Sequence, residues 1–209
     1  RKLQPGEKLA PHNLAFVALG AGLLWFGWFG FNGGSALAAN GVAATAFVNT
    51  DIAASVAMIV WLAVAWMREK KPSMTGALTG AVAGLATVTP AARYVAPWAA
   101  ALIGLFAALV CYAAVQFRIQ RDWDDALDVW GVHGVGGILG VVCTGIFASA
   151  AVNAITSLIE GNVNQFGVQV LAVVVTSVYS FAVTYGLLRL INLFAPVRVD
   201  ETVEAQGLD

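Results

Sequence analysis

Long apolar runs alternate with short polar or Pro- and Gly-containing breaks along the whole chain. A helix needs about 20 apolar residues to cross a hydrocarbon core of about 30 Å, and the runs reach or approach that length. The pattern predicts six transmembrane helices, near residues 13–37, 43–67, 73–90, 95–117, 126–150 and 166–195. We therefore expect an all-α fold, a polytopic membrane helix bundle, with a short acidic tail over residues 199–209.

Three glycines mark one face of the third predicted helix. Gly76, Gly80 and Gly84 follow one another at four-residue spacing, which places them on the same side of a helix. Small residues allow two membrane helices to approach closely. We expect this face to serve packing rather than chemistry.

The composition agrees with a membrane protein. Of the residues, 59% are hydrophobic and 11% are charged, whereas about a quarter of a soluble domain is charged. A net charge of −1 gives no basic surface for nucleic acid, so this class of partner is set aside. Cys111 and Cys143 lie inside apolar runs, which favours packing residues over a disulfide.

The basic residues are distributed unevenly between the two sides of the predicted bundle. Of the 11 Lys and Arg residues, only Arg93 falls in a loop on one side. The others lie on the opposite side or near it: Arg1, Lys2, Lys8, Arg68, Lys70, Lys71, Arg118, Arg121, Arg189 and Arg198. Because loops rich in Lys and Arg stay in the cytoplasm, both ends of the chain are predicted to be cytoplasmic.

One histidine, His133, lies inside the fifth predicted helix, in the stretch GVHGVGGILG. If this helix starts near Asp125, the rise of about 1.5 Å per residue places the imidazole about 12 Å in, close to the bilayer midplane. The residues that follow His133 at helical spacing are small: Gly137, Gly140 and Thr144. We therefore expect the imidazole to point inward, along a groove of small side chains. Such a histidine is either a functional group or a buried brace between two helices.

A second cluster lies near the outer end of the first predicted helix, in GWFGFNGGSA. Trp28, Phe31 and Ser35 are spaced so that they share one helix face. Aromatic faces attract small cations, and a serine oxygen accepts a hydrogen bond from one, so the cluster is a candidate cation site. An aromatic belt at the membrane interface explains the same residues without any ligand.

The chain resembles the ammonium transporter (Amt/Mep/Rh) family, and specifically its Amt/Mep branch. The resemblance is carried by PHNLAFVALGAGLLWFGWFGFNGGSA, AFVNT, TPAARYV and DDALDVWGVHGVGGILG, and it covers the second half of the transporter. It implies that residues 1–198 are the second inverted repeat plus the final long helix of an eleven-helix fold. It also implies a homotrimer with a narrow pore through each monomer, in a plasma membrane, here the inner membrane of a bacterium or archaeon.

The resemblance assigns roles by matching position. Trp28 and Ser35 would form the outer ammonium-recruitment site, Phe31 the aromatic gate beneath it, and His133 one of two pore histidines. Asp125 and Asp128 match acidic positions at the cytoplasmic start of the helix, where we expect a structural role because negative charge suits a helix N-terminus. The first repeat and its pore histidine are absent from this chain, and Trp130 stands where a phenylalanine is more usual in the family.

Asp51 is an acid inside an apolar run. One interpretation is a carboxyl capped by a neighbouring helix or close to the outer interface. The other is a charge that tunes the ammonium path.

The expected function is ammonium transport, with recruitment of NH4+, deprotonation, and conduction past a mid-membrane histidine. An ammonium sensor with the same fold is the alternative, and a pigment or haem protein ligated by His133 is a minor one. No nucleophile–base pair or metal constellation is evident, so we expect no enzyme activity, no cofactor and no metal. The expected partners are ammonium or ammonia, the lipid bilayer and, as the resemblance suggests, a PII-type regulatory protein on the cytoplasmic face.

Overall fold

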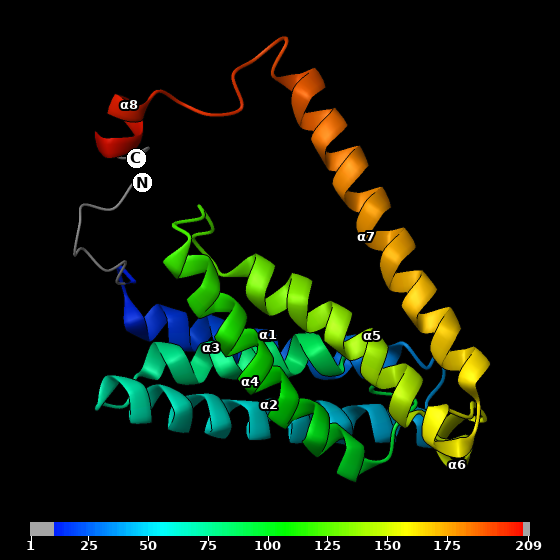
Figure 1. Cartoon of the computed structure of the whole chain (residues 1–209). Coiled ribbons are helices and arrows are strands. Elements are labelled where there is room, and N and C mark those ends of the chain that lie inside the picture. Colours follow the sequence, from blue (N-terminus) through cyan, green and yellow to red (C-terminus); the bar gives the residue numbers. More distant parts are fainter. Residues whose placement is uncertain (1–10, 207–209) are drawn as a thin grey trace. The chain divides into compact units, whose positions relative to one another are not determined.

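The computed structural model describes residues 11–206, and over these residues the chain is built from helices without a strand. The longer helices are α1 (Leu14–Gly34), α2 (Gly41–Glu69), α3 (Met74–Val88), α4 (Pro97–Gln120), α5 (Gly136–Phe147) and α7 (Val163–Ile191). The short ones are a π-helix η1 (Trp130–Val135), α6 (Ala150–Asn153), a 3-10 turn η2 (Leu158–Glu160) and α8 (Glu201–Gln206). The prediction of an all-α polytopic bundle is confirmed (Figure 1).

Within residues 11–206, five helices are long and apolar enough to cross a membrane: α1, α2, α4, the continuous η1–α5 helix and α7. The third predicted span forms α3, which has 15 residues and is shorter than the others. It ends at Val88, and the chain then turns over residues 89–95 before α4 begins with a proline in its first turn. Proline suits that position because its missing N–H would have no partner there anyway.

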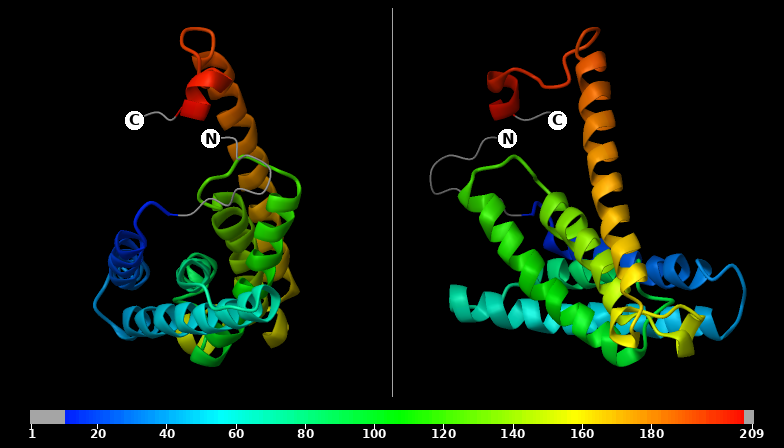
Figure 2. Two further views of the ribbon diagram at one scale, coloured as in Figure 1. Left: turned by 90° about the vertical axis from the view of Figure 1, so that its left-hand side faces the viewer. Right: turned by 45° about the vertical axis from the view of Figure 1, so that its right-hand side comes forward.

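The chain divides into two units, residues 14–173 and a unit that includes residues 174–206, and each is described by itself. In the first, α2 packs against α1, α3 and α4, and α3 also contacts η1 and α5 (Figure 2). Alanine dominates the buried residues of this bundle, together with Trp61, Leu85 and Ile103. Small side chains bring the helix backbones close, so contacts between them replace the burial of large side chains.

Glycines set the distance between α2 and α3. A Cβ on Gly80 would lie 2.5 Å from the Cβ of Trp61 and 2.9 Å from the carbonyl oxygen of Ala57. A Cβ on Gly84 would lie 2.5 Å from the carbonyl oxygen of Ala53. The predicted packing role of this glycine face is therefore confirmed at Gly80 and Gly84.

The second unit contains the C-terminal part of α7 and the tail. Arg198 pairs with Glu204 at 3.0 Å, and this contact fastens α8 to the segment before it. The hydrogen bonds from Arg198 lower the pKa of the Glu204 carboxyl below its ordinary value. The predicted tail over 199–209 thus contains a short helix, and residues 207–209 lie outside the described residues.

Candidate functional site

Trp28 and Phe31 lie next to each other near the end of α1. Their ring centroids are 6.1 Å apart, and the rings meet edge to face. Trp28 is half-buried, whereas Phe31 is 66% exposed. The indole Nε1 of Trp28 donates to Oγ1 of Thr89 at 2.8 Å, so the turn after α3 fixes the indole plane. The two rings therefore present aromatic surface at one end of the bundle. The hydrogen bond to Thr89 fixes the ring of Trp28, whereas the ring of Phe31 is exposed.

Ser35 follows directly after the last residue of α1. Its Oγ donates to the carbonyl oxygen of Asn32 at 2.7 Å. A hydroxyl that donates its proton in this way keeps lone pairs with which it can accept from a ligand N–H. Asn32 itself is buried and donates to Oγ1 of Thr50 at 2.9 Å, which ties the end of α1 to α2. Trp28 and Phe31 thus contact each other near the end of α1, and Ser35 directly follows that helix.

Arg93 and Asn49 also hold this end of the bundle, and the apolar pattern of the sequence predicts a role for neither. The guanidinium of Arg93 donates to the backbone carbonyl of Ser35 and, at 2.7 Å, to the hydroxyl of Tyr94. Asn49 is fully buried, and its amide donates to the carbonyl oxygens of Ala92 and Val95 at 2.8 and 2.7 Å. One signal in the sequence is that Arg93 is the basic residue predicted to lie in a loop on the side opposite to the others.

His133 lies in the π-helix η1 at the start of the fifth helical segment, and its side chain is exposed. The neighbouring glycines have different surroundings. A Cβ on Gly136 would lie 2.8 Å from Oγ1 of Thr87, whereas a Cβ on Gly137 would meet no atom within 4 Å. The imidazole therefore lies on the side of the helix that residues 14–173 leave uncovered.

The predicted groove of small side chains along His133 is wrong. Gly140 and Thr144 are buried, and Gly140 packs so closely against the backbone of Thr87 that no Cβ fits. Only Gly137 shares the open side with His133. Gly140 faces α3, and the π-helical turn before α5 changes the angle between His133 and the residues of α5, because its hydrogen-bonding pattern is wider than that of an α-helix.

The predicted helix start near Asp125 is also wrong, because the π-helix begins at Trp130. His133 is therefore only three residues into η1. Its depth follows instead from α4, since the preceding Gly131 packs on Val115 and the following Gly136 packs near Cys111. These α4 positions lie about 8 to 14 Å from the end of α4 at Gln120. The imidazole is thus inside the span, in the half nearer that end.

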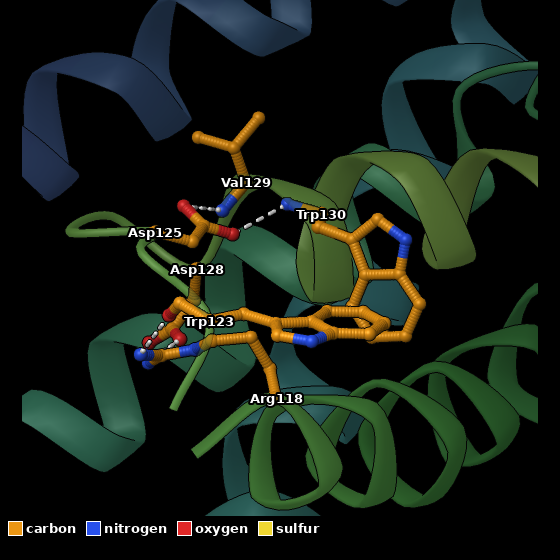
Figure 3. Close-up of polar contacts among 6 residues, drawn as sticks. All are labelled: Arg118, Trp123, Asp125, Asp128, Val129 and Trp130. Atoms are coloured by element: carbon orange, nitrogen blue, oxygen red, sulfur yellow. Dashed lines mark hydrogen bonds and ion pairs between the residues drawn. The ribbon is translucent and has the colours of Figure 1, made fainter. Parts of the chain in front are cut away.

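The two acids before the helix make contacts typical of a cap and a tether (Figure 3). The two carboxylate oxygens of Asp125 accept from the backbone N–H groups of Val129 and Trp130 at 3.0 and 2.8 Å. Asp128 forms an ion pair with Arg118, near the end of α4. Both side chains therefore act on the start of the helix and on the loop before it.

Asp51 is exposed on α2, one turn after Phe47. Its carboxyl is thus not capped by another helix within residues 11–206. Over the same residues, no hydrogen bond or ring contact joins His133 to Trp28, Phe31 or Ser35. We refer to Trp28, Phe31 and Ser35 as the outer cluster, after the predicted location of these residues. The outer cluster and His133 are therefore two separate sites within the described residues.

Comparison with known proteins identifies relatives along the whole sequence. The profile of the Ammonium Transporter Family matches residues 1–209. The ammonium transporter of Bacillus subtilis is 43% identical over 211 residues, which covers 100% of this chain and 52% of that protein. Ammonium transporter Amt1 of Archaeoglobus fulgidus is 46% identical over 201 residues, which covers 96% of this chain and 51% of that protein. The chain therefore spans about half the length of these curated relatives.

Solved structures show the same fold. The crystal structure of Candida albicans Mep2 is similar with a TM-score of 0.87 and 35% identity, over 92% of this chain and 44% of that one. A structure named Sensor Amt Protein is similar with a TM-score of 0.89 and 31% identity, over 100% of this chain and 52% of that one. The family resemblance drawn from the sequence motifs is confirmed.

Proposed function

Because this chain belongs to the ammonium transporter family, we propose that it forms one half of a path that carries ammonium across a membrane. NH4+ is recruited at Trp28, Phe31 and Ser35, loses a proton, and the resulting NH3 passes His133. The protein is a multi-pass membrane protein. We place it in the plasma membrane, the inner membrane of a bacterium or archaeon, with both ends of this chain cytoplasmic because of its basic loops.

The positive charge of ammonium is the main obstacle to its passage through the hydrocarbon core of a membrane. Moving an ionised group of this size into hydrocarbon costs on the order of tens of kcal/mol. A cation–π contact returns only about 1 to 2 kcal/mol, so Trp28 and Phe31 can capture NH4+ but cannot carry it across. Proton and ammonia therefore have to travel separately. An imidazole suits the proton because its neutral ring accepts at one nitrogen and donates at the other.

The observation that carries the proposal is the exposed imidazole of His133 inside a membrane span, with open space beside it at Gly137. A histidine that braced two helices of this chain would be buried and hydrogen-bonded to one of them. An exposed one is accessible to a substrate or to groups from the remainder of the protein. The arrangement thus favours the functional interpretation over the brace.

Transport is tested with the complete protein that contains this chain, reconstituted in liposomes. An inward ammonium gradient should produce flux that saturates with concentration and exceeds that of protein-free liposomes. Saturable binding of ammonium without flux above the protein-free level would contradict transport and support the sensor.

The sensor is the second candidate because a structure named Sensor Amt Protein matches over the whole chain. In this function, ammonium binding at the outer cluster changes the cytoplasmic face without net passage of substrate. The recruitment residues Trp28, Phe31 and Ser35 are then needed as before, whereas His133 is not needed for a relay. Flux is therefore the property that separates the two functions.

The family relationship also leads us to propose a homotrimer and a PII-type regulatory partner. The loops at 68–72 and 118–125 and the tail carry most of the charge and would provide the docking face. Particle mass in detergent and co-purification with a PII protein from the same cell check the two proposals. A monomeric particle would contradict the homotrimer. Failure of the PII protein to bind at low salt with its effectors present would contradict the regulatory partner.

A further inference from the structure

The segment between α4 and η1 adopts a backbone that needs support. Asp122 and Asp128 have φ values of 52° and 54°, in the left-handed region that residues other than glycine rarely adopt. Such conformations persist where surrounding contacts determine them. The supporting contacts come from the end of α4, from the segment itself and from the start of η1 (Figure 3).

Aromatic rings form one part of this support. The indole of Trp123 meets the indole of Trp130 edge to face, with centroids 5.2 Å apart. It also meets the ring of Phe117, on α4, at 5.5 Å. Trp123 therefore links the irregular segment to α4 on one side and to the first residue of η1 on the other.

Hydrogen bonds form the other part. Asp125 accepts from the first two N–H groups of the helical segment, those of Val129 and Trp130. Arg118 pairs with Asp128 and also donates to the carbonyl oxygen of Trp123 at 3.4 Å. We refer to Phe117, Arg118, Trp123, Asp125, Asp128 and Trp130 together as the loop cluster.

The loop cluster acts on the turn that carries His133. Trp130 is the first residue of η1, and His133 follows within the same π-helical stretch. Conversion of a π-turn to α-helix shifts the residues before it by one position, which is a rotation of about 100° around the helix axis. Such a shift would turn the imidazole from the uncovered side of the helix toward its neighbours. The orientation of His133 thus depends on the register in which Trp130 is held.

We propose that Trp123 and Asp125 are positioning residues for His133: they hold Trp130 in the register that keeps η1 π-helical and the imidazole on the open side. The inference rests on the proposed function, because it concerns the same histidine. Neither residue touches the path. Each acts through Trp130, Trp123 by its ring and Asp125 by its carboxylate.

The test compares Trp123→Leu, Trp123→Phe and Trp98→Leu in the complete protein. Trp98 is the matched control because it is another half-exposed tryptophan in an edge-to-face contact, with Phe147, away from the loop cluster. Trp123→Leu should lower the maximal ammonium-induced current about tenfold or more, because small misplacements of reacting groups cost rates of this order. The half-saturation concentration should stay unchanged. Trp123→Phe should restore most of the current, and Trp98→Leu should keep it.

A His133→Ala protein measured in parallel separates this inference from the proposed function. If His133→Ala carries full current, the proposed function is wrong. If His133→Ala carries none while Trp123→Leu matches wild type, the positioning inference is wrong. Should Trp123→Leu fail to assemble, Asp125→Asn takes its place, since it weakens the cap without removing a ring. It should lower the maximal current in the same direction, and a wild-type current from a folded Asp125→Asn protein would overturn the inference.

Discussion

The indole of Trp28 has a fixed orientation because its N–H is bonded to Thr89, a residue in the turn directly after α3. That bond leaves the ring face, rather than the N–H, as the group available to a ligand. Ser35 shows the same division, since its proton goes to Asn32 and its lone pairs remain able to accept. At the scale of the residue, the outer cluster therefore offers π faces and an oxygen acceptor, which suit a small cation with N–H donors.

A substitution at Trp28 tests this arrangement. Trp28→Phe removes the hydrogen bond to Thr89 and replaces the ring that attracts cations best with a weaker one. The half-saturation concentration for methylammonium should rise about threefold to tenfold, which corresponds to about 0.6 to 1.4 kcal/mol. The maximal flux should stay close to wild type. The measurement is the concentration dependence of uptake, with Trp98→Phe as control, and equal curves for all three proteins would remove Trp28 from the recruitment site.

The sequence predicted the residues of the outer cluster but not what holds them. Trp28, Phe31 and Ser35 could be found because helical spacing within one segment places them on one face. Thr89 and Arg93 could not, because their bonds to Trp28 and Ser35 join residues 61 and 58 positions apart. Residue spacing carries no information about such pairs, which arise only when α1 packs beside α3.

At the scale of the element, the η1–α5 helix has one packed side and one open side. Gly140 lies against the backbone of Thr87, where a Cβ would overlap, and Gly137 lies where a Cβ would meet nothing within 4 Å. The packed side fixes the helix to α3, and the open side carries His133. Gly140 therefore serves packing and Gly137 leaves space beside His133, although the sequence predicted that both would line one groove.

Alanine substitutions distinguish the two sides. Gly140→Ala forces α5 and the end of α3 apart, because backbone atoms of Thr87 cannot rotate away as a side chain can. It should lower stability by about 1 to 3 kcal/mol or more. Gly137→Ala is the matched control and should melt like wild type. A thermal melt of the detergent-solubilised proteins checks this, and equal melting of the Gly140→Ala and wild-type proteins would contradict the packing described for α5.

The sequence did not predict where this helix begins or that its first turn is π-helical. Apolar periodicity locates a span, but it does not report where hydrogen bonding begins. The irregular backbone up to Asp128 and the π-turn after it depend on the ion pair with Arg118 and on the cap from Asp125. Of the three small residues that a 3.6-residue period assigned to the face of His133, Gly140 and Thr144 are buried and Gly137 stays on its side.

At the scale of the whole molecule, the chain spans about half of its curated relatives, and its helices leave apolar surface uncovered. The bundle could be predicted from the sequence, because long apolar segments and interrupting polar turns leave few alternatives in a membrane. The path could be predicted only in part. The side of the helix that carries His133 could not be predicted, because the π-turn changes which residues share a face with it.

The central claim is that His133 moves protons rather than bracing helices, and one paired measurement tests it. In the complete protein, ammonium-pulse currents on a solid-supported membrane and a thermal melt are recorded for wild type and His133→Ala from the same preparations. We expect the His133→Ala current to be lost and the melt to be unchanged, because the imidazole is exposed and, over residues 11–206, its removal leaves no buried hydrogen-bond partner unpaired. A brace would instead cost about 1 to 3 kcal/mol of stability when truncated. A folded His133→Ala protein with wild-type current, or one whose current is lost together with its assembly, would contradict the claim.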